Sequence, residues 1–251
     1  MTGDDEVRSG AAARPGGPSH GGPGATGAPG WNALHLFCTV GRETDRAGVE
    51  VAVKACEAAG NGVVTASMLG HKSDLGVLAL GPSLPALRAL QTGLVDAGCT
   101  VAYSYVSLTE VSEYAAGVPE KMREARLHPV LPPEAMPAFC FYPMSKRRTG
   151  EDNWYRLGYD ERLALMHGHG ATGRTFHGRV LQLVTGSTGL DDWEWGVTLF
   201  SVSLDELKSC VYTMRFDEAS ARYAEFGPFL VGTVGTLAEV LDTLGVHGTR
   251  S

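Results

Sequence analysis

Side chains able to do chemistry gather in the second half of this 251-residue sequence. The run from Phe139 to Lys146 is typical of a β-strand, and a period of two places Tyr142, Met144 and Lys146 on one face. A phenol, a thioether and an ammonium group then line one surface of a sheet. The ammonium group suits a ligand that carries carboxylates, although exposed cations often serve solvation alone.

Further polar and aromatic residues surround that strand in the sequence. The strand at 179–185 places Gln182 on an otherwise apolar face, where the amide bonds either a ligand or water. Trp154 and Trp195 are flat walls that suit either an aromatic core or a planar cofactor. Arg215, near a predicted helix end, suits either a ligand carboxylate or the helix dipole.

One histidine extends an apolar helix stripe. In the helix predicted at 160–169, His169 follows Leu165 by four residues and Met166 by three, so it faces the sheet, whereas His167 lies off the stripe. Such a histidine is either a hydrogen-bonded core residue or a metal ligand. No HExxH motif or second imidazole at ligand spacing accompanies it, which argues against zinc. Haem iron needs only one axial protein ligand.

Composition excludes several other classes of protein. Acidic residues outnumber basic ones, 28 to 21, which argues against nonspecific binding to nucleic acid or anionic membranes. No apolar run is long enough to span a bilayer, and the N-terminus lacks the apolar region of a secretory signal, so we expect a cytoplasmic protein. The five cysteines form no CxxC pair, and phosphate-loop, dinucleotide and GxSxG motifs are absent.

The elements that must position these residues fall into two similar sets. Residues 1–30 are rich in Gly and Pro and predict a disordered tail, residues 31–116 and 138–251 each predict the order β-α-β-β-α-β, and residues 117–137 are the linker. This order is ferredoxin-like, so the fold class is α+β. Two such units could pack sheet on sheet and enclose a cavity. The second unit is the working one, and the first has a structural role.

Several runs in the second unit resemble the chlorite dismutase-like superfamily of haem proteins, and within it the coproheme decarboxylases of the actinobacterial type. The matching runs are Tyr142–Arg148, Asn153–Tyr155, Leu165–Arg174, Gly186–Ser187, Asp191–Phe200 and Met214–Tyr223. The resemblance implies that the two ferredoxin-like units join in a dimeric α+β barrel. It also implies a homopentamer with the cofactor site in the second unit.

The resemblance further implies a reaction. Hydrogen peroxide would drive oxidative decarboxylation of two propionates of iron-coproporphyrin III (coproheme) to vinyl groups. The product is haem b, formed through a three-propionate intermediate, and the substrate serves as its own redox cofactor. The upstream coproporphyrin ferrochelatase is then a candidate for transient contact.

The resemblance also implies roles for individual residues. His169 would bind the iron, Tyr142 would carry a radical because a phenol can lose an electron and a proton together, and Lys146 would hold a propionate. His128 would deprotonate peroxide, unless it is a solvent-exposed loop residue. The remaining pocket residues are Met144, Trp154, Gln182 and Trp195 as walls or polar contacts, and Arg215 and Ser220 as propionate ligands.

Two other functions fit the same residues. A chlorite dismutase or general haem peroxidase is disfavoured by Gln182, which stands where chlorite-degrading relatives carry an arginine. A neutral amide cannot retain an oxychlorine anion as a guanidinium can. A non-catalytic haem carrier or sensor would need His169 but neither Tyr142 nor Lys146.

Overall fold

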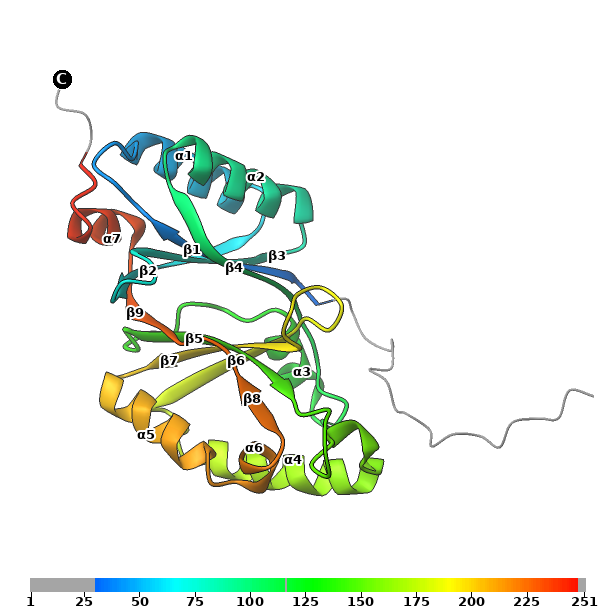
Figure 1. Cartoon of the computed structure of the whole chain (residues 1–251). Coiled ribbons are helices and arrows are strands. Elements are labelled where there is room, and N and C mark those ends of the chain that lie inside the picture. Colours follow the sequence, from blue (N-terminus) through cyan, green and yellow to red (C-terminus); the bar gives the residue numbers. More distant parts are fainter. Residues whose placement is uncertain (1–29, 116, 248–251) are drawn as a thin grey trace, which may run out of the picture.

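A computed structural model describes residues 30–115 and 117–247, so nearly all of the predicted tail lies outside the described residues (Figure 1). The first unit follows the predicted order β-α-β-β-α-β. These elements are β1 (Asn32–Thr39), α1 (Arg46–Ala58), β2 (Gly62–Leu69), β3 (Leu75–Gly81), α2 (Leu84–Asp96) and β4 (Thr100–Thr109).

The second unit repeats this order with additions. Its main elements are β5 (Ala138–Lys146), α4 (Tyr159–Arg174), β6 (Val180–Gly186), β7 (Trp195–Ser201), α5 (Leu204–Met214) and β9 (Leu230–Gly235). Four short elements were not predicted: α3 (Glu120–Leu127), η1 (Trp154–Arg156), α6 (Glu218–Ala221) and β8 (Ala224–Phe226). Helix α3 lies within the segment 117–137 that the sequence indicates as a linker. Helix α4 also continues past its predicted end at His169.

Local sequence explains where several of these helices begin. The side chains of Asp45, Ser83 and Ser203 accept hydrogen bonds from backbone N–H groups in the first turns of α1, α2 and α5. These groups have no partner within their helices, so the capping residues fix the start of each helix. Pro85 in the first turn of α2 is also tolerated there, because no helical hydrogen bond needs its missing N–H.

The strands form one closed barrel. Each unit has the ferredoxin-like strand arrangement, β4-β1-β3-β2 in the first and β6-β7-β5-β9 in the second. Strands β2 and β9 pair from Thr65↔Gly235 to Leu69↔Val231, whereas β4 and β6 pair only at Leu108↔Gly186 and Thr109↔Thr185. The predicted α+β barrel of two ferredoxin-like units is therefore confirmed, with one long seam and one short seam between the units.

The interior of the barrel is filled with side chains. Phe37 and Tyr105 of the first unit pack against Phe139, Phe141 and Phe200 of the second, and all five are buried. The expectation of a cavity enclosed between the two sheets is wrong, because these aromatic rings occupy the space. The space between the two sheets is therefore hydrophobic core and not a ligand site.

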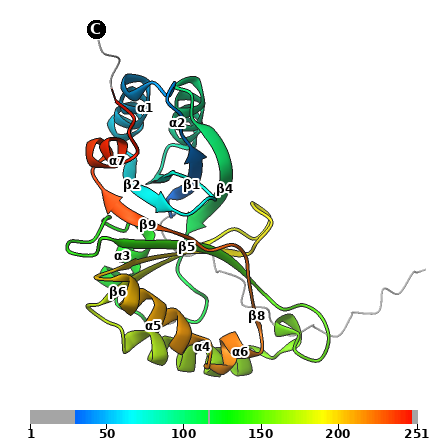
Figure 2. The same cartoon turned by 60° about the vertical axis from the view of Figure 1, so that its left-hand side comes forward.

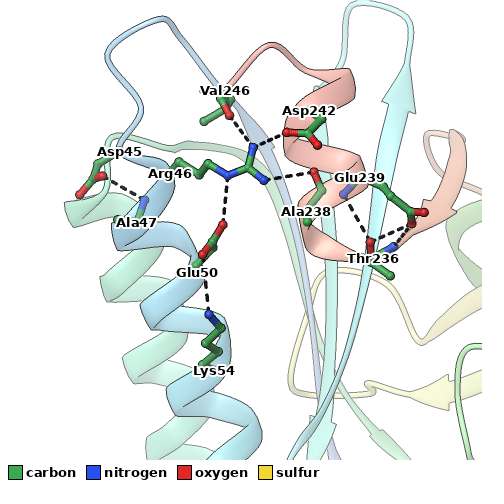
Figure 3. A network of polar contacts seen from close by, with 10 residues as sticks. All are labelled: Asp45, Arg46, Ala47, Glu50, Lys54, Thr236, Ala238, Glu239, Asp242 and Val246. Atoms are coloured by element: carbon green, nitrogen blue, oxygen red, sulfur yellow. Dashed lines mark hydrogen bonds and ion pairs between the residues drawn. The ribbon is translucent and has the colours of Figure 1, made fainter. Parts of the chain in front are cut away.

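The end of the chain returns to the first unit. Helix α7 (Leu237–Thr243) buries Val240 and Leu241 in the core formed by α1, α2 and their sheet. Arg46 of α1 fixes this helix through hydrogen bonds to Asp242, Ala238 O and Val246 O, and it also pairs with Glu50 (Figure 3). The first unit therefore depends on the last helix of the chain for part of its core.

Candidate functional site

The predicted site residues on strands share the outer face of the second unit's sheet. Tyr142 on β5 pairs with Val197 on β7, which pairs in turn with Val184 on β6. The next row of partners on one side ends at Gln182, and the next row on the other side contains Met144, Trp195 and Gly186. Because cross-strand partners point to the same face, Tyr142 lies centrally between Gln182 and Trp195.

The phenol of Tyr142 is buried among apolar side chains, which favour its protonated form. Its ring stacks on Phe229 with centroids 4.5 Å apart and contacts Phe226 at 5.8 Å. Burial raises the pKa of Tyr142 well above its usual range, although the nearby charge of Arg215 opposes this shift. Arg215 itself lies 3.7 Å from the centroid of Phe226, a cation–π contact. A cation therefore lies close to a neutral phenol.

The helices of the second unit lie on the outer side of these strands (Figures 1 and 2). Helix α4 packs mainly on α5 and α6, and Arg162 is its one fully buried residue. The apolar stripe residues Leu165 and Met166 are only half-buried, and Gln182 and Val184 on the facing side of β6 are exposed. In the first unit, by contrast, α1 buries four apolar side chains and α2 buries three. The second unit thus leaves apolar surface uncovered by protein.

His169 is oriented by a carboxylate. Its Nδ1 lies 3.0 Å from Oδ2 of Asp217, and the side chains are 25% and 8% exposed. An ionised carboxylate only accepts hydrogen bonds, so Nδ1–H is the donor, and in the neutral form of the imidazole Nε2 carries the lone pair. Within the described residues Nε2 has no hydrogen-bond partner. This is the arrangement of a metal-binding histidine whose second nitrogen is fixed by an outer carboxylate.

The sequence analysis assigned no role to Asp217, although it lies in the matching run Met214–Tyr223. It is the N-cap of α6 and accepts the backbone N–H of Ser220 at 3.2 Å. Burial raises its pKa, but hydrogen bonds from His169 and Ser220 outweigh burial, and the net pKa is below its usual range. Ser220 thus supports the carboxylate that orients the histidine.

Lys146 is buried beside the same short helix. Only 7% of the residue is exposed; Nζ donates a 2.7 Å hydrogen bond to Ala219 O and lies 4.4 Å from the ring centroid of Trp154. Burial lowers its pKa to about 8, while the carboxylates of Asp217 and Glu194 act in the opposite direction. The segment 215–220 therefore supplies neighbours to all three of Tyr142, Lys146 and His169.

Within the described residues, His128 makes no hydrogen bond or ring contact with these groups. It follows α3 as its C-cap residue, its Nδ1 is 2.6 Å from Glu124 Oε1, and its ring contacts Trp31 at 4.9 Å. Neither partner belongs to the predicted site.

The two predicted tryptophans differ in exposure. Trp154 is enclosed by protein, between Lys146, Tyr114 and Tyr223. Trp195 is half-buried on the open sheet face.

A metal ion with only protein ligands does not fit the described chain. Residues 30–115 and 117–247 contain no group of three or more His, Cys, Asp or Glu side chains placed to hold one. His169 could supply a single ligand, so the metal must bring most of its other ligands, as porphyrin iron does. Among the helices of these described residues, none combines the length and the hydropathy that a membrane span needs.

Two ferredoxin-like units in one closed barrel define the structural class of this protein. Residues 43–235 match the family model described as chlorite dismutase, and the chain belongs to this family. A novel heme-binding protein from Thermus thermophilus is 36% identical, with 87% of this chain and 96% of that chain covered and a TM-score of 0.76. Chlorite dismutase from Candidatus Nitrospira defluvii, solved with imidazole, is 20% identical over 86% and 95% of the chains, with a TM-score of 0.69.

Proposed function

We propose that this protein binds iron-coproporphyrin III and uses hydrogen peroxide to convert two of its propionates to vinyl groups, giving haem b. The observation that carries the proposal is the His169–Asp217 pair, which leaves Nε2 ready for one axial bond to iron. The partly uncovered apolar face between the sheet and α4 supports a flat ligand there. The 36% identical heme-binding relative supports a porphyrin as that ligand.

The iron porphyrin and peroxide supply the oxidising equivalents. His169 would hold the iron, and the charge of Asp217 would make the imidazole more basic. Tyr142 would give up an electron and its proton, and then take a hydrogen atom from the β-carbon of a propionate. Each propionic acid and one hydrogen peroxide then yield one vinyl group, one carbon dioxide and two waters.

Cationic and polar side chains would hold the propionates. Arg215 lies close to Tyr142, and Lys146 would pair with a carboxylate after exchanging its hydrogen bond to Ala219 O. Ser220, Met144, Trp154 and Trp195 would complete the surroundings as the resemblance implies. His128 would take the proton of peroxide, and this role requires α3 to bring it close to the iron.

Mass spectrometry of the porphyrin tests the proposal. When peroxide is titrated into the purified protein with coproheme, we expect the porphyrin mass to fall in two steps, one for each propionate that loses carbon dioxide. The Tyr142→Phe variant should bind coproheme normally but leave the propionates intact. An unchanged porphyrin with the wild type would contradict decarboxylation and favour a haem carrier. Oxygen release from chlorite would favour chlorite dismutase, against which the neutral Gln182 argues.

The proposed setting is a cytoplasmic homopentamer that receives coproheme from coproporphyrin ferrochelatase. Light scattering of the purified protein should give five times the chain mass. Cross-linking with the ferrochelatase in the presence of coproheme would reveal the contact.

A further inference from the structure

A carboxylate of the first unit reaches the ligand face of the second. Glu110 directly follows the last residue of β4, at the short seam where β4 meets β6. A Cβ atom built on Gly186 of β6 would lie 2.5 Å from the carboxyl carbon of Glu110. The carboxylate therefore rests on the backbone of Gly186, in space that any side chain at this position would occupy.

The strand register shows which face this is. Gly186 pairs directly with Trp195, and Trp195 pairs with Met144. A Cβ at position 186 and the side chains of Trp195 and Met144 therefore point to the same outer face. Glu110 thus lies beside Trp195, one row away from Tyr142.

The Trp195 side chain favours the charged form of the Glu110 carboxylate. Desolvation raises the pKa of Glu110, as does the nearby charge of Glu113, whereas hydrogen bonding from the Trp195 side chain lowers it. The indole N–H is a donor without acceptor capacity. The described residues give it no other hydrogen-bond partner. Loss of the carboxylate would leave this group unpaired and the half-buried ring free to turn.

We propose that Glu110 is a positioning residue that holds the Trp195 indole against the porphyrin, so that the first unit takes part in ligand binding across the short seam. The inference rests on the proposed function in that it takes coproheme as the ligand. It also gives Gly186 a specific role, because a Cβ at this position would displace the carboxylate from its place.

Equilibrium binding of ferric coproheme tests this role. Glu110→Leu removes the acceptor and should weaken binding about tenfold, equal to about 1.4 kcal/mol. Glu110→Gln keeps an acceptor oxygen and should bind within about twofold of the wild type. Gly186→Ala leaves both partners in the chain but displaces the carboxylate, so it should resemble Glu110→Leu.

Two controls separate positioning from general damage. Gly62→Ala is the matched strand substitution, because its Cβ would meet only Leu80 O at 3.9 Å, and it should bind like the wild type. In a Trp195→Phe background, Glu110→Leu should cause no further loss of affinity. Without ligand, the near-ultraviolet circular dichroism contributed by Trp195 should change in Glu110→Leu and not in Glu110→Gln.

Wild-type affinity in both Glu110→Leu and Gly186→Ala would overturn the inference. So would an equal loss from Glu110→Leu with and without Trp195. If Glu110→Leu does not fold, Gly186→Ala alone decides. Coproheme binding without carbon dioxide release would refute the proposed function but leave this inference intact, whereas no binding by the wild type would overturn both.

Discussion

The pair formed by His169 and Asp217 gives the most direct test of the site. Replacing Asp217 by Asn removes one charge but keeps the N-cap of α6, because Asn caps helices as well as Asp does. The 3.0 Å distance and the 8% exposure of Asp217 indicate a bond little weakened by solvent. Loss of such an outer partner costs about 10–100-fold in metal affinity. Because the Asn oxygen can still accept the Nδ1–H bond, we expect the lower end, about tenfold.

The assay is a titration of the ligand-free variant with ferric coproheme, followed by the Soret absorbance. Glu218→Gln is the matched control, because it removes a neighbouring charge that is 60% exposed and paired with Arg222. It should bind like the wild type. Equal affinities of Asp217→Asn and Glu218→Gln would refute the assignment of Asp217 as the partner that orients the iron ligand.

Asp217→Asn should also change how the free energy of unfolding falls in acid. The pKa of Asp217 is lower in the folded protein, so the unfolded chain takes up the proton first as the pH falls. The stability contributed by this group is therefore complete above about pH 4 and is lost as the pH falls through the folded pKa. Urea denaturation of Asp217→Asn should show a shallower loss of stability in acid. A slope identical to the wild type would contradict the lowered pKa.

Three further substitutions test other parts of the structure. Gly196→Ala would place a Cβ 2.6 Å from the Tyr105 ring in the filled barrel, and should lower the free energy of unfolding by about 1–3 kcal/mol; unchanged urea denaturation would contradict the packing. Burial lowers the pKa of Lys146 to about 8 in the folded protein, so between this pH and about 10.4 Lys146 binds more protons in the unfolded chain than in the folded one. The free energy of unfolding contributed by this group therefore rises with pH in that range, by at most about 1.4 kcal/mol per pH unit. Lys146→Met should remove that rise, and a variant that keeps the full rise would show that another group causes it. His128→Ala should slow the reaction of the coproheme complex with peroxide in stopped-flow measurements, and an unaltered rate would remove its role as a base.

Local patterns in the sequence predicted the elements, while long-range packing decided how they fill space. The period of two along β5 correctly places Tyr142 and Met144 on one face, because alternation is a property of the strand itself. The strand order also follows from the β-α-β-β-α-β succession. The enclosed cavity was a wrong expectation. Whether rings such as Phe141 fill the interior depends on contacts between the two units, which the local pattern does not contain.

Site residues that depend on tertiary contacts were less accessible to sequence reasoning. The stripe on α4 singled out His169, but its partner Asp217 lies 48 residues further along the chain. The position of Asp217 before α6 is a capping signal, and such a signal does not reveal a second role. Glu110 gave no signal in the sequence, because its neighbours Gly186 and Trp195 belong to the other unit.

The course of the last helix limits how this protein can be divided. Residues 31–116 expressed alone would lack Val240 and Leu241 and would expose the apolar surface that these side chains cover. The remaining half would in turn carry an orphan amphipathic helix that favours aggregation or capture of a sister fragment. Co-expression of the two halves as separate polypeptides should therefore rescue solubility that neither achieves by itself.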